Sequence, residues 1–163
     1  MWRWLLIALV VMLLDQASKH VIVAAMQDRP PIEVTSFFNL VLVHNPGAAF
    51  SFLAGAGGWQ RTFFTAVAVI ASVWISWLLY RHPHERLFCM ALALVLGGAL
   101  GNLIDRVTIG AVVDFLDFHA FGWHWPAFNL ADSAITCGAG LLIWDGIRGG
   151  GAGKTNDKTT GTS

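Results

Sequence analysis

Charged residues are scarce in this chain of 163 residues, where they make up 12% of the sequence, against about 25% in an ordinary soluble domain. The ten basic and ten acidic residues cancel, so the formal net charge is zero. A chain without a basic stripe lacks the electrostatic footprint of a nucleic-acid-binding protein. We therefore expect no nucleic acid among its partners.

Cysteine is scarcer still, with two residues, Cys89 and Cys137, both inside apolar stretches. That placement argues against a disulfide framework and against a cysteine-ligated metal site. The six histidines form neither an HExxH motif nor a cluster with cysteine, the sequence patterns that indicate zinc. We expect neither a metal nor a cofactor.

Apolar residues, in contrast, are abundant at 56% of the sequence, and they gather in four stretches. Each approaches the roughly 20 residues needed to cross the hydrocarbon layer of a membrane. The alternative is a soluble protein with four buried core helices, which the hydropathy of the stretches argues against. We predict a single integral membrane domain over residues 1–148 and a flexible cytoplasmic tail over 149–163. The predicted transmembrane helices cover residues 4–26, 62–80, 87–105 and 128–147.

The first stretch has a second interpretation, as a secretory signal peptide with cleavage after Ala17. The apolar run resumes after this position, however, in the sequence VIVAAM that begins at Val21. Cleavage would remove one span and leave three. We therefore predict that the first helix is retained.

The basic residues predict the orientation of the helices. With four spans, one side of the membrane carries six basic residues and the other four, and the short loops count most in this comparison. The bias places both termini in the cytoplasm and makes residues 27–61 and 106–127 the outer loops. The six are Arg3, Arg81, Arg86, Arg148, Lys154 and Lys158, and the four are Lys19, Arg29, Arg61 and Arg106.

Polar residues interrupt three of the predicted helices, and in this orientation all three interruptions lie at the outer face. Within each set the residues are three or four positions apart, which places them on one face of a helix. We therefore expect the three polar faces to converge on one site near the outer leaflet. The sets are Asp15 with Lys19, Asn102 with Asp105 and Arg106, and Asn129 with Asp132.

Each set also has a purely structural interpretation. Asp15 and Lys19 are spaced for an ion pair that fixes helix packing. The two asparagines are of the kind that hydrogen-bond between transmembrane helices, which contributes about 0.6–2 kcal/mol each.

The two outer loops differ in composition. Residues 27–58 are rich in β-branched and aromatic residues around an Asn-Pro-Gly turn signal, which predicts a short β-hairpin or small sheet lying on the membrane. The second loop is dense in aromatic rings, which suits the headgroup level of a membrane. We expect it to serve as an interfacial anchor, as a lid over the polar site, or as both. Its rings belong to Phe115, Phe118, Phe121, Trp123 and Trp125.

Acidic residues at a membrane face suit two kinds of chemistry. Two carboxyl groups that share one proton hold a water molecule between a general base and a general acid, as in aspartic peptidases. The alternative is transport, with the acids as a relay for protons or ions, although four spans without an internal repeat disfavour it. Spacing alone does not choose among Asp105, Asp114, Asp117 and Asp132.

Five segments, in order and with suitable gaps, resemble the motif regions of bacterial lipoprotein signal peptidase, or signal peptidase II. The resemblance extends from about residue 13 to residue 147, and only the Gly-rich tail lies outside it. The segments are LLDQASK (13–19), VHNPGAAFS (43–51), GNLIDR (101–106), VVDFLDF (112–118) and FNLADS (128–133).

The resemblance implies an all-α membrane protein, a bundle of four transmembrane helices with a small extracytoplasmic β-cradle and a short periplasmic helix or lid. It implies an aspartic endopeptidase of the bacterial inner membrane whose active site faces the periplasm. The expected partners are membrane lipid and lipid-modified prolipoproteins. These would be cut just before the cysteine that carries the diacylglyceryl group, which releases the signal peptide.

The resemblance also implies roles for single residues. Asp114 and Asp132 would be the catalytic dyad, and Asp15 and Lys19 would be a supporting pair. The polar residues around the site would be Asn45, Asn102, Arg106 and Asn129, and two roles stay open for Arg106: binding a substrate carbonyl or pairing with Asp105.

Overall fold

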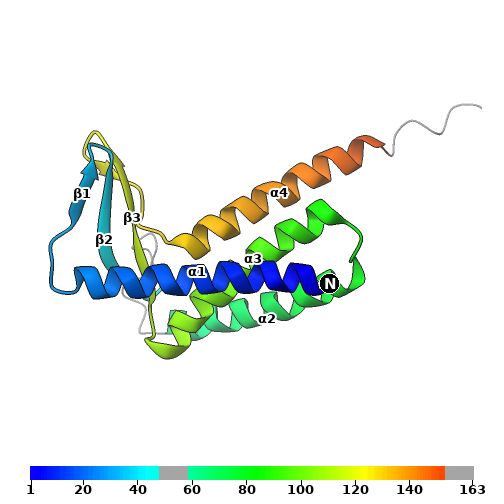
Figure 1. Ribbon diagram of the computed structural model, residues 1–163, viewed down its shortest axis with the longest axis horizontal. Coiled ribbons are helices and arrows are strands. Elements are labelled where there is room, and N and C mark those ends of the chain that lie inside the picture. Colours follow the sequence, from blue (N-terminus) through cyan, green and yellow to red (C-terminus); the bar gives the residue numbers. More distant parts are fainter. Residues whose placement is uncertain (48–58, 153–163) are drawn as a thin grey trace, which may run out of the picture.

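Four long helices and a small antiparallel sheet make up the computed structural model, which describes residues 1–47 and 59–152 (Figure 1). Every helix is long and apolar enough to cross a membrane, which confirms the four predicted spans. The helices are α1 (Trp2–Met26), α2 (Trp59–Arg81), α3 (Arg86–Thr108) and α4 (Leu130–Ala152), and the strands are β1 (Ile32–Thr35), β2 (Phe38–Asn45), β3 (Val112–Ala120) and β4 (Trp123–His124).

Helix α3 is the centre of the bundle, because it packs against each of the other three helices. Small residues allow the close approach. A methyl group on Gly97 would lie 2.6 Å from the carbonyl oxygen of Ala8 in α1, and one on Gly101 would lie 2.5 Å from the Asp15 carboxylate. Glycine is therefore required where α3 crosses α1, and at Gly101 it makes room for a charged side chain.

The sheet lies at one end of the bundle, where α1 and α3 end and α2 and α4 begin (Figure 1). Its strands run in the order β1-β2-β3-β4, and each neighbouring pair is antiparallel. Phe128 then forms backbone hydrogen bonds with Phe115 and Leu116 of β3. These bonds fix the start of α4 against the strand that contains Asp114.

The second outer loop contains two strands, and its role as an interfacial anchor or a lid stays a prediction. Phe115 and Phe118 belong to β3 and Trp123 to β4, while Phe121 lies in the turn between these strands and Trp125 follows β4. This segment therefore supplies two of the four strands and joins β2 in the same sheet. The aromatic and β-branched side chains suit a half-buried strand as well as an interface, which is why the pattern alone did not separate the two. Asp114 is consequently held in a paired strand, not in an irregular loop.

The first outer loop contains β1, β2 and the turn at Asn45-Pro46-Gly47, where Gly47 has a φ of +112° and its amide donates to the Asn45 side chain. Within residues 27–47 and 109–129 the structure has strands and turns and no helix, so the expected short periplasmic helix is not found in these two ranges. The alternative of a lid stays a prediction. Residues 48–58, which include the end of the second motif, lie outside the described residues, as does the end of the expected tail after residue 152.

Candidate active site

A buried ion-pair network joins α1 to α3. The Lys19 ammonium lies 2.8 Å from Asp15 Oδ2, 2.8 Å from Asp105 Oδ2 and 2.9 Å from Asn102 Oδ1. These contacts use all three protons of the ammonium group. Lys19 is 2% exposed, Asp15 0% and Asp105 4%, so the network is shielded from water and its members depend on one another.

Asp15 extends this network to α4. Its Oδ1 atom accepts a 2.9 Å hydrogen bond from the backbone amide of Ala131, the second residue of α4. The first amides of a helix have no partner within the helix, and a negative charge at this end is favoured by the helix dipole. A single carboxylate therefore fixes the start of α4 beside α1 and α3.

The contacts of Asp105 bear on the two roles left open for Arg106. The Asp105 carboxylate binds Lys19, the Gln16 side chain at 2.8 Å and the Val113 amide at 3.1 Å. Among the described residues its ion-pair partner is Lys19, and it forms no ion pair with Arg106.

Asn129 is fully buried and connects the two remaining acids. Its side-chain amide donates to Asp114 Oδ1 at 2.7 Å and to Asn102 Oδ1 at 3.2 Å. Its side-chain oxygen accepts a hydrogen bond from the Asp132 backbone amide at 2.9 Å, which makes Asn129 the N-cap of α4. One side chain thus sets the start of a helix and the position of a strand carboxylate.

Asp114 and Asp132 line one cavity of about 410 Å³. Asp114 Oδ2 accepts a hydrogen bond from Asn45 at 3.0 Å, and Asp132 Oδ1 accepts one from Asn102 at 2.7 Å. The three polar sets therefore do converge, through direct hydrogen bonds between α1, α3 and α4.

The environment of Asp114 favours its protonated form. Burial raises the pKa of this carboxyl group to about 6, and the nearby Asp132 adds to the rise, while hydrogen bonds from Asn45 and Asn129 oppose it. A carboxyl group with such a pKa can give up and regain a proton near neutral pH, which is what a general acid or base requires.

Asp117, three residues from Asp114 along β3, belongs to a different surface. Positions an odd number apart in a strand point to opposite faces of the sheet. The Asp117 carboxylate accepts hydrogen bonds from Asn39 at 3.0 Å and from His124 at 2.9 Å. Burial alone would raise the pKa of Asp117, but these hydrogen bonds outweigh it and hold the pKa below its ordinary value.

The contact between Asp117 and His124 was not anticipated from the sequence, nor was the stacking of His119 on His124 at 4.9 Å. Asp117 and His119 are two positions apart and therefore share one face of the strand, a spacing that could have indicated a cluster of ionisable side chains. Recognising it also needs the register that places His119 opposite His124. Within residues 1–47 and 59–152, no three His, Cys, Asp or Glu side chains are placed to hold a metal ion.

Arg106 lines the same cavity as the two acids. Its guanidinium lies 5.5 Å from the ring centre of Phe64, and its Nη1 atom is 3.4 Å from the Asn102 carbonyl oxygen. Its buried Nε atom has no hydrogen-bond partner among the described residues. The Arg61 side chain donates to the Arg106 carbonyl oxygen at 3.0 Å, so that α2 holds the end of α3. The guanidinium thus has capacity for a further acceptor.

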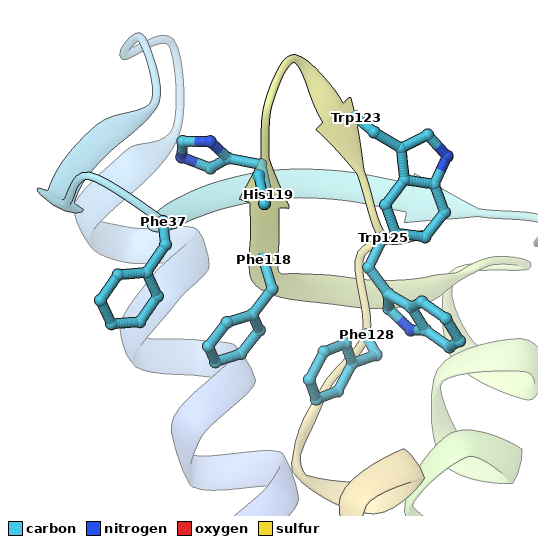
Figure 2. Close-up of a pocket in the computed structure, with 7 residues that line it drawn as sticks. Phe37, Phe118, His119, Trp123, Trp125 and Phe128 are labelled. Carbon is cyan, nitrogen blue, oxygen red and sulfur yellow. The ribbon is translucent and has the colours of Figure 1, made fainter.

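An aromatic pocket of about 490 Å³ lies beside the site, on the sheet (Figure 2). Phe118 and Phe128 stack with ring centres 5.9 Å apart, and Trp123 and Trp125 meet edge to face at 5.8 Å. Trp125 and Phe128 also line the cavity that contains the two acids. The apolar pocket and the acidic cavity are therefore neighbours that share two aromatic walls.

Comparisons with known proteins agree on one family. The family model described as Signal peptidase (SPase) II matches residues 7–148. The chain is 61% identical over 145 residues to a protein named "Lipoprotein signal peptidase" from Cupriavidus taiwanensis, covering 89% of this chain and 82% of that one. A protein of the same name from Paraburkholderia phytofirmans is also 61% identical over 145 residues, with 89% and 84% covered.

Two solved structures share the fold. One, described as "Bacterial membrane enzyme structure by the in meso method at 2.3 A resolution", has a TM-score of 0.82 and 33% identity, covering 98% of this chain and 96% of that one. Another of the same description at 1.9 Å resolution has a TM-score of 0.77 and 35% identity, covering 89% and 92%.

Proposed function

The chain belongs to the signal peptidase II family of aspartic peptidases, and from that premise we propose that Asp114 and Asp132 are the dyad with which it cleaves prolipoproteins. Removal of signal peptides from prolipoproteins is the activity that the family carries. The proposal adds the catalytic pair and the position of the cut, just before the lipidated cysteine. The observation that carries it is the single cavity lined by both acids.

In the proposed reaction the two carboxyl groups share one proton and hold a water molecule between them. The ionised carboxylate takes a proton from the water as its oxygen attacks the scissile carbonyl carbon. The protonated carboxyl group then donates its proton to the leaving amide nitrogen. Cleavage yields a new carboxylate on the signal peptide and a free amino group on the lipidated cysteine. A pKa of about 6 allows Asp114 to hold or release the shared proton near neutral pH.

The surrounding polar residues have positioning and binding roles in this proposal. Asn45 and Asn129 orient Asp114, and Asn102 orients Asp132 through the hydrogen bonds described above. Arg106 binds the substrate carbonyl oxygen, because its guanidinium lines the cavity and its Nε atom has no partner among the described residues. A cation there also stabilises the negative charge that develops on that oxygen during attack.

The depth of the site fits a lipidated substrate. The diacylglyceryl group would hold the cysteine at the membrane surface, so the water-activating acids must sit at the same depth. Asp132 lies in the first turn of α4, and the sheet that contains Asp114 adjoins that end of the bundle (Figure 1). We propose that this end faces the periplasm and that the enzyme resides in the inner membrane with both termini cytoplasmic.

The contacts of two basic residues strengthen the prediction, made from the distribution of basic residues, that both termini are cytoplasmic. Two of the four basic residues assigned to the outer side are parts of the site: Lys19 is buried in the ion-pair network and Arg106 lines the cavity. Neither is then a free loop charge that would hold a segment in the cytoplasm. The bias toward cytoplasmic termini therefore rests on fewer opposing charges than the sequence alone suggested.

The dyad is tested by Asp114→Asn, Asp132→Asn and the double variant, in a gel-shift assay with a purified diacylglyceryl-modified prolipoprotein. Each substitution keeps the size of the side chain but removes a proton-exchanging group. General acid or base catalysis typically contributes about 10²–10⁴-fold, and residues that act as a unit lose activity non-additively. We expect each single variant to be nearly as inactive as the double variant.

Asp117→Asn is the matched control, because it makes the same change in another buried carboxylate of β3 that does not line the cavity. It should retain most of the activity. Substantial cleavage by either dyad variant would refute the assignment, and so would a folded but inactive Asp117→Asn variant.

A further inference from the structure

Two further cavities adjoin the catalytic cavity, one beside each acid. A cavity of about 300 Å³ shares Asn45 and Asp114 with it and is otherwise lined by strand and loop residues, among them Val43 and Pro126. The other is the α4 groove, of about 390 Å³, which shares Asp132 and runs along the start of α4. The α4 groove is lined by Trp125, Phe128, Asp132, Ser133, Thr136 and Cys137.

The α4 groove leads away from the dyad into the membrane-spanning part of the helix. Cys137 comes five residues after Asp132, which is about 7.5 Å along a helix that rises 1.5 Å per residue. Thr136 and Cys137 are exposed on the surface of the bundle. The groove therefore connects the site of the chemistry with the level of the lipid chains.

The depth of the α4 groove limits what can occupy it. An extended peptide there would bring backbone amides and carbonyls into hydrocarbon without partners, which membrane proteins avoid. A helical peptide, about 10 Å wide, would need roughly 600 Å³ over the same length, more than the groove offers. A hydrocarbon chain has no hydrogen bonds to satisfy and is much thinner than a helix.

The proposed reaction supplies such a chain at this place. The lipid is attached to the side chain of the cysteine whose amide nitrogen leaves the scissile bond, so it must depart from the catalytic cavity close to the dyad. The aromatic pocket of Figure 2 shares Trp125 and Phe128 with the cavity but neither acid. Within the described residues, the aromatic pocket and the two further cavities all adjoin the catalytic cavity. Of these three, the α4 groove is the one that both contains a dyad residue and descends along a helix.

We propose that the α4 groove is the subsite for one acyl chain of the substrate's diacylglyceryl group, with Trp125 and Phe128 at its entrance and Cys137 at its deep end. This inference rests on the proposed function, since it needs cleavage beside the lipidated cysteine. The shape of the groove then selects for a lipidated substrate. The peptide binds on the other side of the catalytic cavity, next to the strands.

Cys137→Trp tests the α4 groove, because an indole at this position fills its deep end without touching the dyad. The substrates are one synthetic lipopeptide in two forms, with palmitoyl or with acetyl groups on the glyceryl cysteine. For the palmitoyl form we expect kcat/KM to fall by about tenfold, at the low end of the effect that a small steric mismatch in a hydrophobic pocket typically has. For the acetyl form, whose chains end before Cys137, we expect less than a twofold change.

One control variant accompanies this measurement. Ala139→Trp places the same bulky ring two residues further along α4, about 200° around the helix, at an exposed position that does not line the groove. It should leave the cleavage of both substrates unchanged.

The outcomes separate the two proposals. If Cys137→Trp cleaves the palmitoyl substrate at the wild-type rate, or loses both substrates equally, the α4 groove is not the acyl subsite, while the dyad assignment stands. If the wild type cleaves neither lipopeptide, the proposed function itself fails. An equal loss in Ala139→Trp would also overturn the subsite, because the effect would not depend on the groove.

Discussion

Replacing Lys19 with methionine removes the one cation from a buried cluster that contains two carboxylates. Methionine keeps most of the length and volume of the side chain, so the change is mainly electrostatic. In the wild type the ammonium lies 2.8 Å from both Asp15 and Asp105. In the variant the two carboxylates face each other without a cation, at positions where they are 0% and 4% exposed.

The expected cost follows from this burial. Removing one partner of a buried ion pair typically destabilises a protein by about 3–5 kcal/mol, because a charge is left without compensation in a medium of low polarity. For a domain of this size 1 kcal/mol corresponds to roughly 2–4 °C in Tm, so we expect Lys19→Met to melt about 6–20 °C below the wild type. Thermal unfolding in detergent, followed by intrinsic tryptophan fluorescence, measures this difference.

The direction of the Tm change that a second substitution causes makes the test specific. Asp105→Asn alone should lower Tm, because Lys19 loses one of its carboxylate partners. In the Lys19→Met background the same substitution should raise Tm, because it removes one of two unpaired charges. This reversal is a coupling that only interacting residues show. If Asp105→Asn lowers Tm by the same amount in both backgrounds, or if Lys19→Met melts within 2 °C of the wild type, the network does not stabilise the fold as argued. A Lys19→Met protein that is as stable as the wild type yet inactive would show instead that the pair serves catalysis.

Two further measurements test the electrostatics and the orientation. Because burial raises the pKa of Asp114 from 3.8 to about 6, the folded state holds this proton more tightly than the unfolded chain does, and its contribution to stability is complete below about pH 4 and lost as the pH rises through 6. We would compare the thermal stability of the wild type with that of Asp114→Asn from pH 4 to pH 7. At 1.36 kcal/mol per pKa unit, the wild type should lose about 2–2.5 kcal/mol relative to the variant over this range, and parallel curves would contradict the assigned environment. For the orientation, a reporter fused after His82 should be cytoplasmic and one fused after Ala120 extracytoplasmic; the reverse result would place the site on the wrong side of the membrane for our proposal.

Much of the architecture could be predicted from the sequence because it depends on local patterns. The length and hydropathy of the apolar stretches determine four membrane-spanning helices, since each segment must satisfy its own backbone hydrogen bonds in lipid. Spacings of three and four residues placed Asp15 beside Lys19 and Asn102 beside Arg106 on common helix faces. The topology then brought these faces to one end of the bundle, where direct hydrogen bonds join them.

The arrangement of the strands was harder to predict, because strand pairing does not depend on local patterns. Their aromatic and β-branched residues suit a sheet, an interfacial anchor and a lid alike, and pairing partners far apart in the sequence decide among these. The register of β2 with β3 places Asp114 opposite Val43 and Asp117 opposite Asn39. No local pattern contains that information.

The surroundings that distinguish the acids are a property of the tertiary structure. In the sequence, Asp105, Asp114, Asp117 and Asp132 are equivalent candidates, and only the motif resemblance distinguished them. In the folded protein, Asp105 is neutralised by Lys19 and Asp117 is bound by His124 on the other face of its strand. Asp114 and Asp132 line one cavity, with asparagines as their hydrogen-bond donors and Asn129 between them. An aspartate's chemistry depends on which charges and donors surround it, and those neighbours come from parts of the chain that only folding brings together.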